Sequence, residues 1–484
     1  MKILLVNPPV DLDRIFGAGK VFVQKYRPLG LLYIAAVARE AGFDVSVIDA
    51  LAEEMSEGEL KKKTAELNPD VVGISTLTSS GSAVWRYGGW LKKNFKDTCV
   101  VLGNVHASVF AQEYLRNSCC DAVVHGEGEN IFPEIAKKVA EKGSFETVRG
   151  ITFRNEKGEI IRTGAAAAQE ISSFPFPARD LLLHGLYNLG KLSNRYFVGG
   201  KGAITETMIS SRGCPRRCTF CAVHGSRSPR FSDPARVVDE MEMLKREYGA
   251  SYILLEDALF LANGPRVLEI CSLIGKRGFK LGWGCQGHVQ CVTREIIKAM
   301  DKAGCYEISL GIESGVQSIL DRINKGTTLE GIREAIRIIK DNSDIHVEGL
   351  FVLGLPGERY EESLKTIEFA KSLPLDMAQF SVLTPYPGSP LFDELRMKGE
   401  IDSGVREDGS VDPAVWDRYA SYICFSNVAP VWITDAFDAD SLRKLQKKAL
   451  RDFYLRPAHI LRHLRRINPG NFAEAFRIAV KGFF

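Results

Sequence analysis

The segment SSRGCPRRCTFC, residues 210–221, places three cysteines close together, at Cys214, Cys218 and Cys221. Structural zinc sites usually take four protein ligands as two separated pairs, and no second C-x2-C pair occurs in the chain. Three thiolates can instead hold an iron–sulfur cubane and leave one iron open to another molecule. The spacing therefore predicts an iron–sulfur cluster with an open iron, and a zinc site completed by His224 or a distant cysteine is the weaker alternative.

The composition sets broad limits on the protein class. The chain has 484 residues, enough for two or three domains, and a formal charge of +3, which gives no overall signature of nucleic-acid binding. We find no run of 18 apolar residues and no leader pattern, so we expect a cytoplasmic protein. The eleven cysteines, an odd number, favour reduced thiols and a metal site over a disulfide framework.

Residues 1–145 alternate short apolar runs with helical stretches. The predicted strands are KILLVN, DVSVID, PDVVGIST, CVVLGN and DAVVHG. This pattern is typical of a doubly wound α/β domain, Rossmann-like, with a parallel sheet. Ligands of such sheets bind at the carboxyl ends of the strands.

The remaining chain is divided into three parts. Residues 146–200 are predicted to be a linker with a small hairpin in GITFRNEKGEIIRTG. Residues 201–395 contain six predicted strands and intervening helices, which indicates a partial (β/α)6 barrel with its active site at the carboxyl ends of the strands. Residues 396–484 are expected to form a mainly helical C-terminal region. The cysteine segment directly follows the first barrel strand, where a barrel places its chemistry.

The cysteine spacing, with Phe220 just before the last cysteine, resembles the signature of the radical S-adenosylmethionine (SAM) superfamily. The resemblance implies a [4Fe–4S] cluster on Cys214, Cys218 and Cys221, with SAM chelated at the open iron. In that superfamily the cluster passes one electron to SAM, which yields a 5′-deoxyadenosyl radical. The protein positions the cofactor and excludes water.

Other strand ends in residues 203–395 also resemble that superfamily, in the same order along the chain. LLED, GIES, the glycine-flanked strand HVEGLFVLG and TPYPGSPLF match the places where the family contacts the ammonium, ribose and adenine of SAM. A solvated strand end is the weaker reading of LLED. The implied SAM-binding residues are Glu256, Asp257, Glu313, Ser314, Gly349, Val352, Gly354 and Tyr386.

The front domain lacks G-x-G-x-x-G after its first strand, so a dinucleotide is not expected. Its S-x-L after the third strand and its glycine after the fourth resemble the spacing in cobalamin-binding domains, and VVHGEGE is similar to the front domains of cobalamin-dependent radical SAM proteins. The implied cobalamin-binding residues are Ser75, Thr76, Leu77, Gly103, Asn104, His106, Gly126, Glu127 and Gly128. His106 could line the pocket or be a satisfied structural histidine, and an empty, degenerate fold is the alternative for the whole domain.

One departure concerns the lower face of cobalamin. Cobalamin domains of the mutase kind supply a histidine from D-x-H-x-x-G, whereas this chain has KYRPLG, with Lys25, Arg27 and Gly30. Arg27 stays protonated and cannot ligate cobalt. We therefore expect no histidine ligand from this loop.

The C-terminal residues 441–466 are rich in lysine and arginine, interleaved with aromatic and aliphatic side chains. A solvated helical cap is the plainer interpretation. The alternative is an amphipathic surface that makes peripheral contact with anionic lipid or guides an apolar substrate.

Together these features predict a cobalamin-dependent radical SAM enzyme that methylates an unactivated carbon of a small molecule. Methylcobalamin and a deoxyadenosyl radical would serve the reaction, and a donor such as flavodoxin or ferredoxin would supply electrons. A cyclase or oxidase acting on an apolar or tetrapyrrole-like substrate would use the same cofactors and stays open. A cobalamin- or metal-binding regulator is the non-enzyme alternative.

Overall fold

The computed structural model describes residues 1–17, 20, 23, 25–187, 204–223, 228–426, 428–457 and 459. The chain divides into two compact units. The first comprises Met1–Asp11, Lys25–Leu186 and Tyr386–Tyr419, and the second comprises Leu12–Gln24, Tyr187–Pro385 and Ala420–Phe484. His224, residues 188–200 of the predicted linker and most of the tail beyond residue 457 lie outside the described residues.

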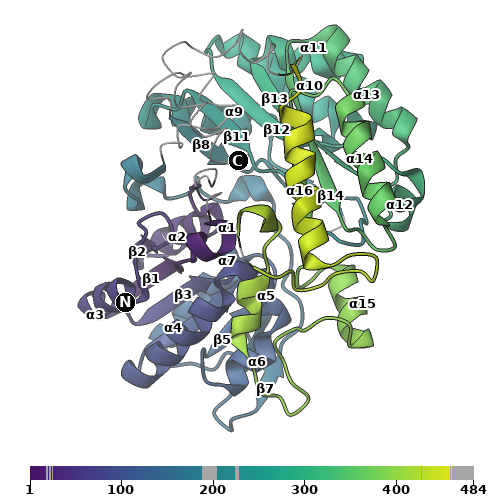
Figure 1. Ribbon diagram of the computed structural model, residues 1–484. Coiled ribbons are helices and arrows are strands. Elements are labelled where there is room, and N and C mark those ends of the chain that lie inside the picture. Colours follow the sequence, from purple (N-terminus) through teal and green to yellow (C-terminus); the bar gives the residue numbers. More distant parts are fainter. Residues whose placement is uncertain are drawn as a thin grey trace. The chain divides into compact units, whose positions relative to one another are not determined.

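The first unit is built on a seven-stranded sheet in the order β2-β1-β3-β4-β5-β6-β7 (Figure 1). Its strands are β1 (Lys2–Asn7), β2 (Asp44–Asp49), β3 (Val71–Ser75), β4 (Cys99–Gly103), β5 (Ala122–Val124), β6 (Ile151–Arg154) and β7 (Ile160–Arg162). The first five strands pair in parallel, so the predicted doubly wound sheet is confirmed. The strand order reverses between β1 and β3, and ligands bind doubly wound sheets at such a switch point.

The helices of the first unit alternate with these strands. They are α2 (Leu29–Glu40), α3 (Glu57–Leu67), α4 (Gly81–Asn94), α5 (Val105–Val109), α6 (Ala111–Arg116), α7 (Gly128–Ala140) and α15 (Pro390–Lys398), with short 3-10 turns η2 (Thr78–Ser80), η3 (Ile171–Ser173), η4 (Arg179–Leu181), η5 (His184–Tyr187) and η8 (Pro413–Arg418). Local sequence sets their ends. In α3, for example, Ser56 Oγ accepts from Glu59 N (3.2 Å) and Glu59 Oε2 accepts from Ser56 N (2.8 Å), a capping box that satisfies two donors.

The predicted hairpin is part of the first sheet. Strand β6 pairs antiparallel with β5, with Val124 opposite Ile151, and β7 pairs with β6. Phe153 on β6 is buried in the core of this unit. The edge of β5 thus gains hydrogen bonds that a free linker would not supply. The predicted domain boundary at residue 145 therefore does not coincide with the boundary of the unit, which extends to Leu186.

Residues 386–419 also belong to the first unit, which corrects the predicted boundary at 395. Trp416 on η8 is fully buried, and its ring centroid lies 5.7 Å from that of Trp85 on α4. Ser82 Oγ donates to Asp417 Oδ1 (2.5 Å) beside it. A local sequence pattern cannot reveal this return, because the contacts join segments more than 300 residues apart.

The second unit contains a six-stranded sheet in the order β15-β14-β13-β12-β11-β8, in which every neighbouring pair is parallel. Its strands are β8 (Thr205–Met208), β11 (Tyr252–Leu255), β12 (Gly282–Gly287), β13 (Cys305–Glu313), β14 (His346–Leu353) and β15 (Met377–Val382). A separate two-stranded ribbon consists of β9 (Ser211–Arg212) and β10 (Arg230–Phe231). The strands lie side by side in the order in which they follow along the chain, and each pairs in parallel with the next. This arrangement confirms the predicted partial barrel.

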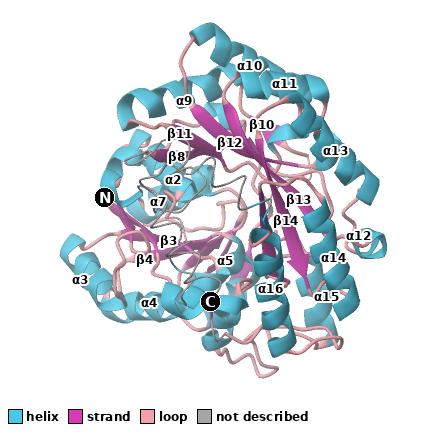
Figure 2. Ribbon diagram, turned by 45° about the horizontal axis from the view of Figure 1, so that its top comes forward, coloured by secondary structure: helices cyan, strands magenta, loops and turns pink. Residues whose placement is uncertain are grey.

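Helices of the second unit form an outer layer around these strands (Figure 2). The helices of this layer are α9 (Pro234–Tyr248), α10 (Gly264–Arg277), α11 (Arg294–Lys302), α12 (Gln317–Arg322), α13 (Leu329–Asn342), α14 (Tyr360–Ser372) and α16 (Ala439–Tyr454). The second unit also contains the short helix α1 (Leu12–Phe16) and the 3-10 turns η6 (Phe260–Ala262), η7 (Val289–Cys291) and η9 (Ile423–Phe425).

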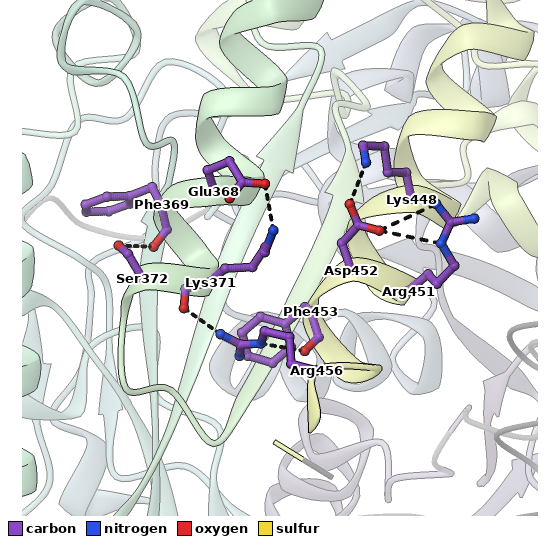
Figure 3. Close-up of polar contacts among 9 residues, drawn as sticks. All are labelled: Glu368, Phe369, Lys371, Ser372, Lys448, Arg451, Asp452, Phe453 and Arg456. Carbon is purple, nitrogen blue, oxygen red and sulfur yellow. Dashed lines mark hydrogen bonds and ion pairs between the residues drawn. The ribbon is translucent and has the colours of Figure 1, made fainter. Parts of the chain in front are cut away.

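Helix α16 closes the free edge of β15. Buried Gln446 donates through Nε2 to Phe380 O (2.7 Å), and Tyr454 Oη donates to Ala378 O (2.9 Å). An uncovered edge strand would present unpaired backbone groups to other chains. Figure 3 shows that Arg456, just beyond the helix, reaches the carbonyl of Lys371 on α14, with 2.5 Å between Nη1 and O. The described start of the basic tail thus packs on β15 and α14, and contact of the tail with lipid stays a prediction.

Among the described residues, no helix combines the length and apolar character needed to span a bilayer.

Candidate cluster and cofactor sites

The cysteine segment leaves the carboxyl end of β8 and runs through the short strand β9. Gly213 follows with a φ of +93°, a conformation that glycine adopts without steric cost. Cys214, Cys218 and Cys221 are half-buried free thiols, and Cys221 N donates to Cys218 O (3.2 Å). In the described part of the chain, no three His, Cys, Asp or Glu side chains converge as a metal-binding group.

Asp257 anchors the start of this segment. Its carboxylate accepts from Ser210 N, Ser210 Oγ and Ser211 Oγ, each at 2.6 Å, and it is fully buried. Arg266 Nη2 donates to Ser210 O (2.8 Å). The sequence predicts Asp257 as a SAM ligand, but the structure commits its carboxylate to holding the backbone that leads into the cysteines.

Glu256 lies beside it at the carboxyl end of β11. Its backbone N–H donates to Met208 O (2.9 Å), so the ends of β8 and β11 are joined here, and the residue is half-buried. Successive residues of a strand point to opposite faces. Because Asp257 points toward Ser210, Glu256 is the carboxylate of this pair that suits a contact with an ammonium group.

A turn formed by residues 323–326 holds the cysteine segment from the other side. Thr219 N donates to Ile323 O (3.0 Å), and Asn324 Nδ2 donates to Arg217 O (3.1 Å). Asn324 has a φ of +54° and Gly326 a φ of +68°, left-handed conformations that these two residue types tolerate best. The turn therefore positions the backbone between Cys214 and Cys221.

Gln290 on η7 adds a side-chain link between the turn 323–326 and the cysteine segment. Its Oε1 accepts from Arg216 Nη1 (2.5 Å), and its Nε2 donates to Gly326 O (2.5 Å). These contacts of the turn 323–326 were not predicted from the sequence. The segment Asn324-Lys325-Gly326 nevertheless signals a tight turn, because asparagine and glycine are the residues that most readily adopt a left-handed conformation.

Glu313 ends β13 in a left-handed conformation, with a φ of +66°. Its Oε1 lies 2.7 Å from Lys325 Nζ, and both side chains are buried. Burial alone would lower the pKa of Lys325, but Glu313 and the nearby Cys218 outweigh it and the pKa is raised. Lys325 is therefore an ammonium group beside the cysteine segment, which sequence reasoning missed.

The next predicted SAM residue, Ser314, is fully buried. Its Oγ accepts from Val316 N (3.1 Å) and lies 3.2 Å from Thr366 Oγ1. These contacts shape the turn before α12 and leave no exposed atom of Ser314 for a ribose. The structure therefore corrects its predicted role to a structural one.

The glycine-flanked strand β14 has two different glycines. A Cβ on Gly349 would lie 2.7 Å from Leu375 Cδ1, so this glycine permits close packing in the barrel core. Gly354 has a φ of +75° at the carboxyl end of β14, and its N–H donates to Glu358 Oε2 (2.7 Å). Val352 is half-buried near the same strand end. Tyr386 belongs to the first unit, where its ring centroid lies 5.9 Å from that of Tyr419.

In the first unit, the carboxyl ends of β3 and β4 are linked to each other. Thr76 N donates to Gly103 O (2.9 Å), and Asn104 Nδ2 donates to Ser75 Oγ (3.2 Å). Leu77 is 48% exposed, an unusually open position for a leucine. The predicted cobalamin residues that follow these two strands therefore lie close together along the side of the sheet where the strands have their carboxyl ends.

The loop after β5 lies along the same sheet edge, because β4 and β5 are parallel neighbours. Gly126 has a φ of +84° and is exposed, Glu127 precedes α7, and Gly128 is its first residue. A Cβ built on Gly103 or Gly126 would meet no atom within 4 Å. This edge therefore offers open backbone and an exposed leucine, which fit a flat, largely apolar ring such as corrin.

The next residue predicted to contact cobalamin is His106. It is fully buried, and its ring centroid lies 4.4 Å from that of Trp416 and 4.7 Å from that of Phe110. Burial lowers its pKa to about 3, so the imidazole is neutral, and neither ring nitrogen has a hydrogen-bond partner among the described residues. No atom of His106 is exposed to a corrin, so the structure favours packing over the predicted pocket-wall role.

Arg27 is buried as well, and its Nη2 lies 3.1 Å from His184 Nδ1. An arginine offers only donors, so Nδ1 of His184 accepts in this contact. Besides His106 and His125, this unit therefore contains a third histidine, His184, which the sequence analysis did not single out.

Comparisons with known proteins agree with this architecture. Residues 208–370 match the model of the radical SAM superfamily, and residues 17–136 match the B12 binding domain. An uncharacterised methyltransferase of Pyrococcus horikoshii is 30% identical over 470 residues, which cover 96% of this chain and 95% of that protein. The anaerobic magnesium-protoporphyrin IX monomethyl ester cyclase of Rubrivivax gelatinosus is 28% identical over 469 residues, which cover 95% of this chain and 78% of that protein.

Among solved structures, the radical SAM methyltransferase TsrM of Kitasatospora setae, with cobalamin and a [4Fe–4S] cluster bound, has a TM-score of 0.66. The alignment covers 97% of this chain and 89% of TsrM at 19% identity, which establishes a shared fold. The chain belongs to the radical SAM superfamily, in the group with a B12-binding domain, whose cofactors are a [4Fe–4S] cluster, SAM and cobalamin.

Proposed function

We propose that this enzyme is a cobalamin-dependent radical SAM methyltransferase that adds a methyl group to an unactivated carbon of a small molecule. The observation that carries the proposal is the near full-length match to a relative named as a methyltransferase, which spans both the front domain and the barrel. When bound, SAM supplies a 5′-deoxyadenosyl radical at the cluster and cobalamin carries the methyl group.

In this proposal Cys214, Cys218 and Cys221 hold the cluster. The free, half-buried thiols on one loop at a strand end support the assignment, because thiolates are the ligands that iron–sulfur clusters take. The anchors at Ser210 and at the turn 323–326 keep the backbone of that loop in place while iron is bound.

SAM would lie at the carboxyl ends of the barrel strands. Glu256 would accept from its ammonium, Glu313 would lie near its ribose, and the backbone around Val352 and Gly354 would border its adenine. Asp257 and Ser314 act on the protein backbone instead.

Cobalamin would bind the front sheet at the edge formed by Ser75–Leu77, Gly103–Asn104 and Gly126–Gly128. The open backbone at Gly103 and Gly126 and the exposed side chain of Leu77 support this placement. Binding there would cover apolar surface, which is favourable in water.

Ring formation or oxidation is the second candidate, favoured by the match to the cyclase of Rubrivivax gelatinosus. Anaerobic incubation with an extract of apolar small molecules and SAM carrying a trideuterated methyl group separates the two. A new compound that retains all three deuteriums supports methyl transfer. A compound whose mass changes without deuterium, while deoxyadenosine forms, supports the cyclase or oxidase.

A further inference from the structure

The pair formed by Lys325 and Glu313 is buried within the second unit. The two side chains are only 8% and 9% exposed, and the distance from Nζ to Oε1 is 2.7 Å. A Cβ on Gly311 would lie 2.6 Å from both of these atoms. The pair thus packs against the bare backbone of β13, and a larger residue at Gly311 would require the ends of both side chains to shift.

The pair also acts electrostatically on the cysteine segment. The turn that carries Lys325 lies against this segment, because Ile323 O accepts from Thr219 N (3.0 Å) and Asn324 Nδ2 donates to Arg217 O (3.1 Å). The ammonium of Lys325 and the carboxylate of Glu313 are therefore buried charges of opposite sign next to the segment that holds Cys218 and Cys221.

We propose that Lys325 is a positioning residue whose charge raises the reduction potential of the cluster, and that Glu313 limits this effect. The inference rests on the proposed cluster site at Cys214, Cys218 and Cys221. Reduction adds one negative charge to a cluster that three thiolates already surround. A buried cation stabilises the reduced form, because buried charges are weakly screened and the net charge around a cluster sets its potential.

A purely structural role accounts less well for an ammonium group. Hydrogen bonds of Ile323 and Asn324 already hold the cysteine segment without the lysine side chain, and Gln290 links Gly326 to Arg216. A buried ion pair also costs desolvation that a well-packed apolar residue would avoid. A charge at this place therefore calls for a role that depends on charge.

The test is a reductive titration of the cluster followed by EPR, on anaerobically reconstituted full-length protein without SAM. Glu313→Gln removes the carboxylate and should raise the midpoint potential. The double variant Glu313→Gln/Lys325→Met removes the ammonium as well and should lower the potential again. The glutamine background is needed because a buried carboxyl left without its lysine would take up a proton and hide the change in charge.

The expected difference between these two variants is about tenfold in the ratio of oxidised to reduced cluster, which is 59 mV for one electron. Glu313→Gln/Lys325→Arg keeps the charge and should remain close to Glu313→Gln. The matched control is the pair Lys340–Asp376, which lies at the amino-terminal ends of β14 and β15, at the sheet edge opposite to the cysteine segment. Asp376→Asn and Asp376→Asn/Lys340→Met should share one potential.

If Glu313→Gln and Glu313→Gln/Lys325→Met keep their iron and have equal midpoint potentials, the inference about Lys325 is overturned, while the proposed cluster site stands. Loss of iron from both Lys325→Met and Lys325→Gln in that background, while Glu313→Gln keeps its iron, would also overturn it and assign Lys325 to holding the loop. Wild-type protein that binds no iron at all would instead remove the proposed cluster site, and the inference with it.

Discussion

The carboxylate of Asp257 accepts hydrogen bonds from both the backbone N–H and the hydroxyl of Ser210, each at 2.6 Å. This contact joins the carboxyl end of β11 to the residue four positions before the first cysteine. It gives two adjacent acidic residues, Glu256 and Asp257, different tasks that mutagenesis can separate.

Asp257→Ala should destabilise the protein and reduce its iron content. It would leave buried donors of Ser210 and Ser211 without their acceptor, at a cost of about 3 kcal/mol. Thermal unfolding and iron analysis check this. A variant with full iron content and an unchanged melting temperature would show that the contact does not support the cysteine segment.

Glu256→Ala should give the opposite result. Iron content should stay at the wild-type level, while SAM affinity falls roughly ten- to hundredfold, because a charge-assisted contact is worth about 1.5–3 kcal/mol. Calorimetric titration with SAM measures the effect. Unchanged affinity would place the carboxylate outside the SAM site.

Leu77→Asp should weaken cobalamin binding without destabilising the fold, since the leucine is 48% exposed. Losing its apolar contact and placing a charge there should cost about 1–3 kcal/mol, or roughly five- to hundredfold in affinity. Met397→Asp on α15, where the side chain is 83% exposed, is the control for a surface charge in the same unit. Equal cobalamin affinity of the two variants would rule out Leu77 as part of the site.

Bound cobalamin should carry no side-chain nitrogen on cobalt. The loop with Lys25 and Arg27 contains no histidine, His106 is fully buried, and His184 Nδ1 lies against Arg27. An axial nitrogen, from a side chain or from the dimethylbenzimidazole base, splits each cobalt line of the cob(II)alamin EPR spectrum into three. We expect base-off cobalamin and therefore unsplit lines. Splitting that disappears in His106→Ala or in His184→Ala would identify that residue as the ligand and refute the expectation.

The sequence predicted the strands of both sheets because short apolar runs mark them directly. It did not separate Glu256 from Asp257, or Glu313 from Ser314. Adjacent residues at a strand end point in opposite directions, and the motif gives only their place in the chain. The assignment of one member of each pair needed the contacts of Ser210 and Val316.

Long-range contacts account for the other differences. The return of Trp416 to the first unit depends on packing against Trp85 and His106, which no local pattern records. The nearness of Lys325 to the cysteine segment likewise depends on the turn beside Thr219. Neither could be found from periodicity or composition.

The most direct test of the account is the metal content of protein purified without oxygen and supplied with iron, sulfide and cobalamin. We expect about four irons and about one cobalt per chain. The triple variant Cys214→Ala/Cys218→Ala/Cys221→Ala should lose the iron and deoxyadenosine formation, yet keep the cobalt, because the two cofactors are assigned to different units. Iron retained in the triple variant, or wild-type protein that takes up no cobalamin, would contradict the account.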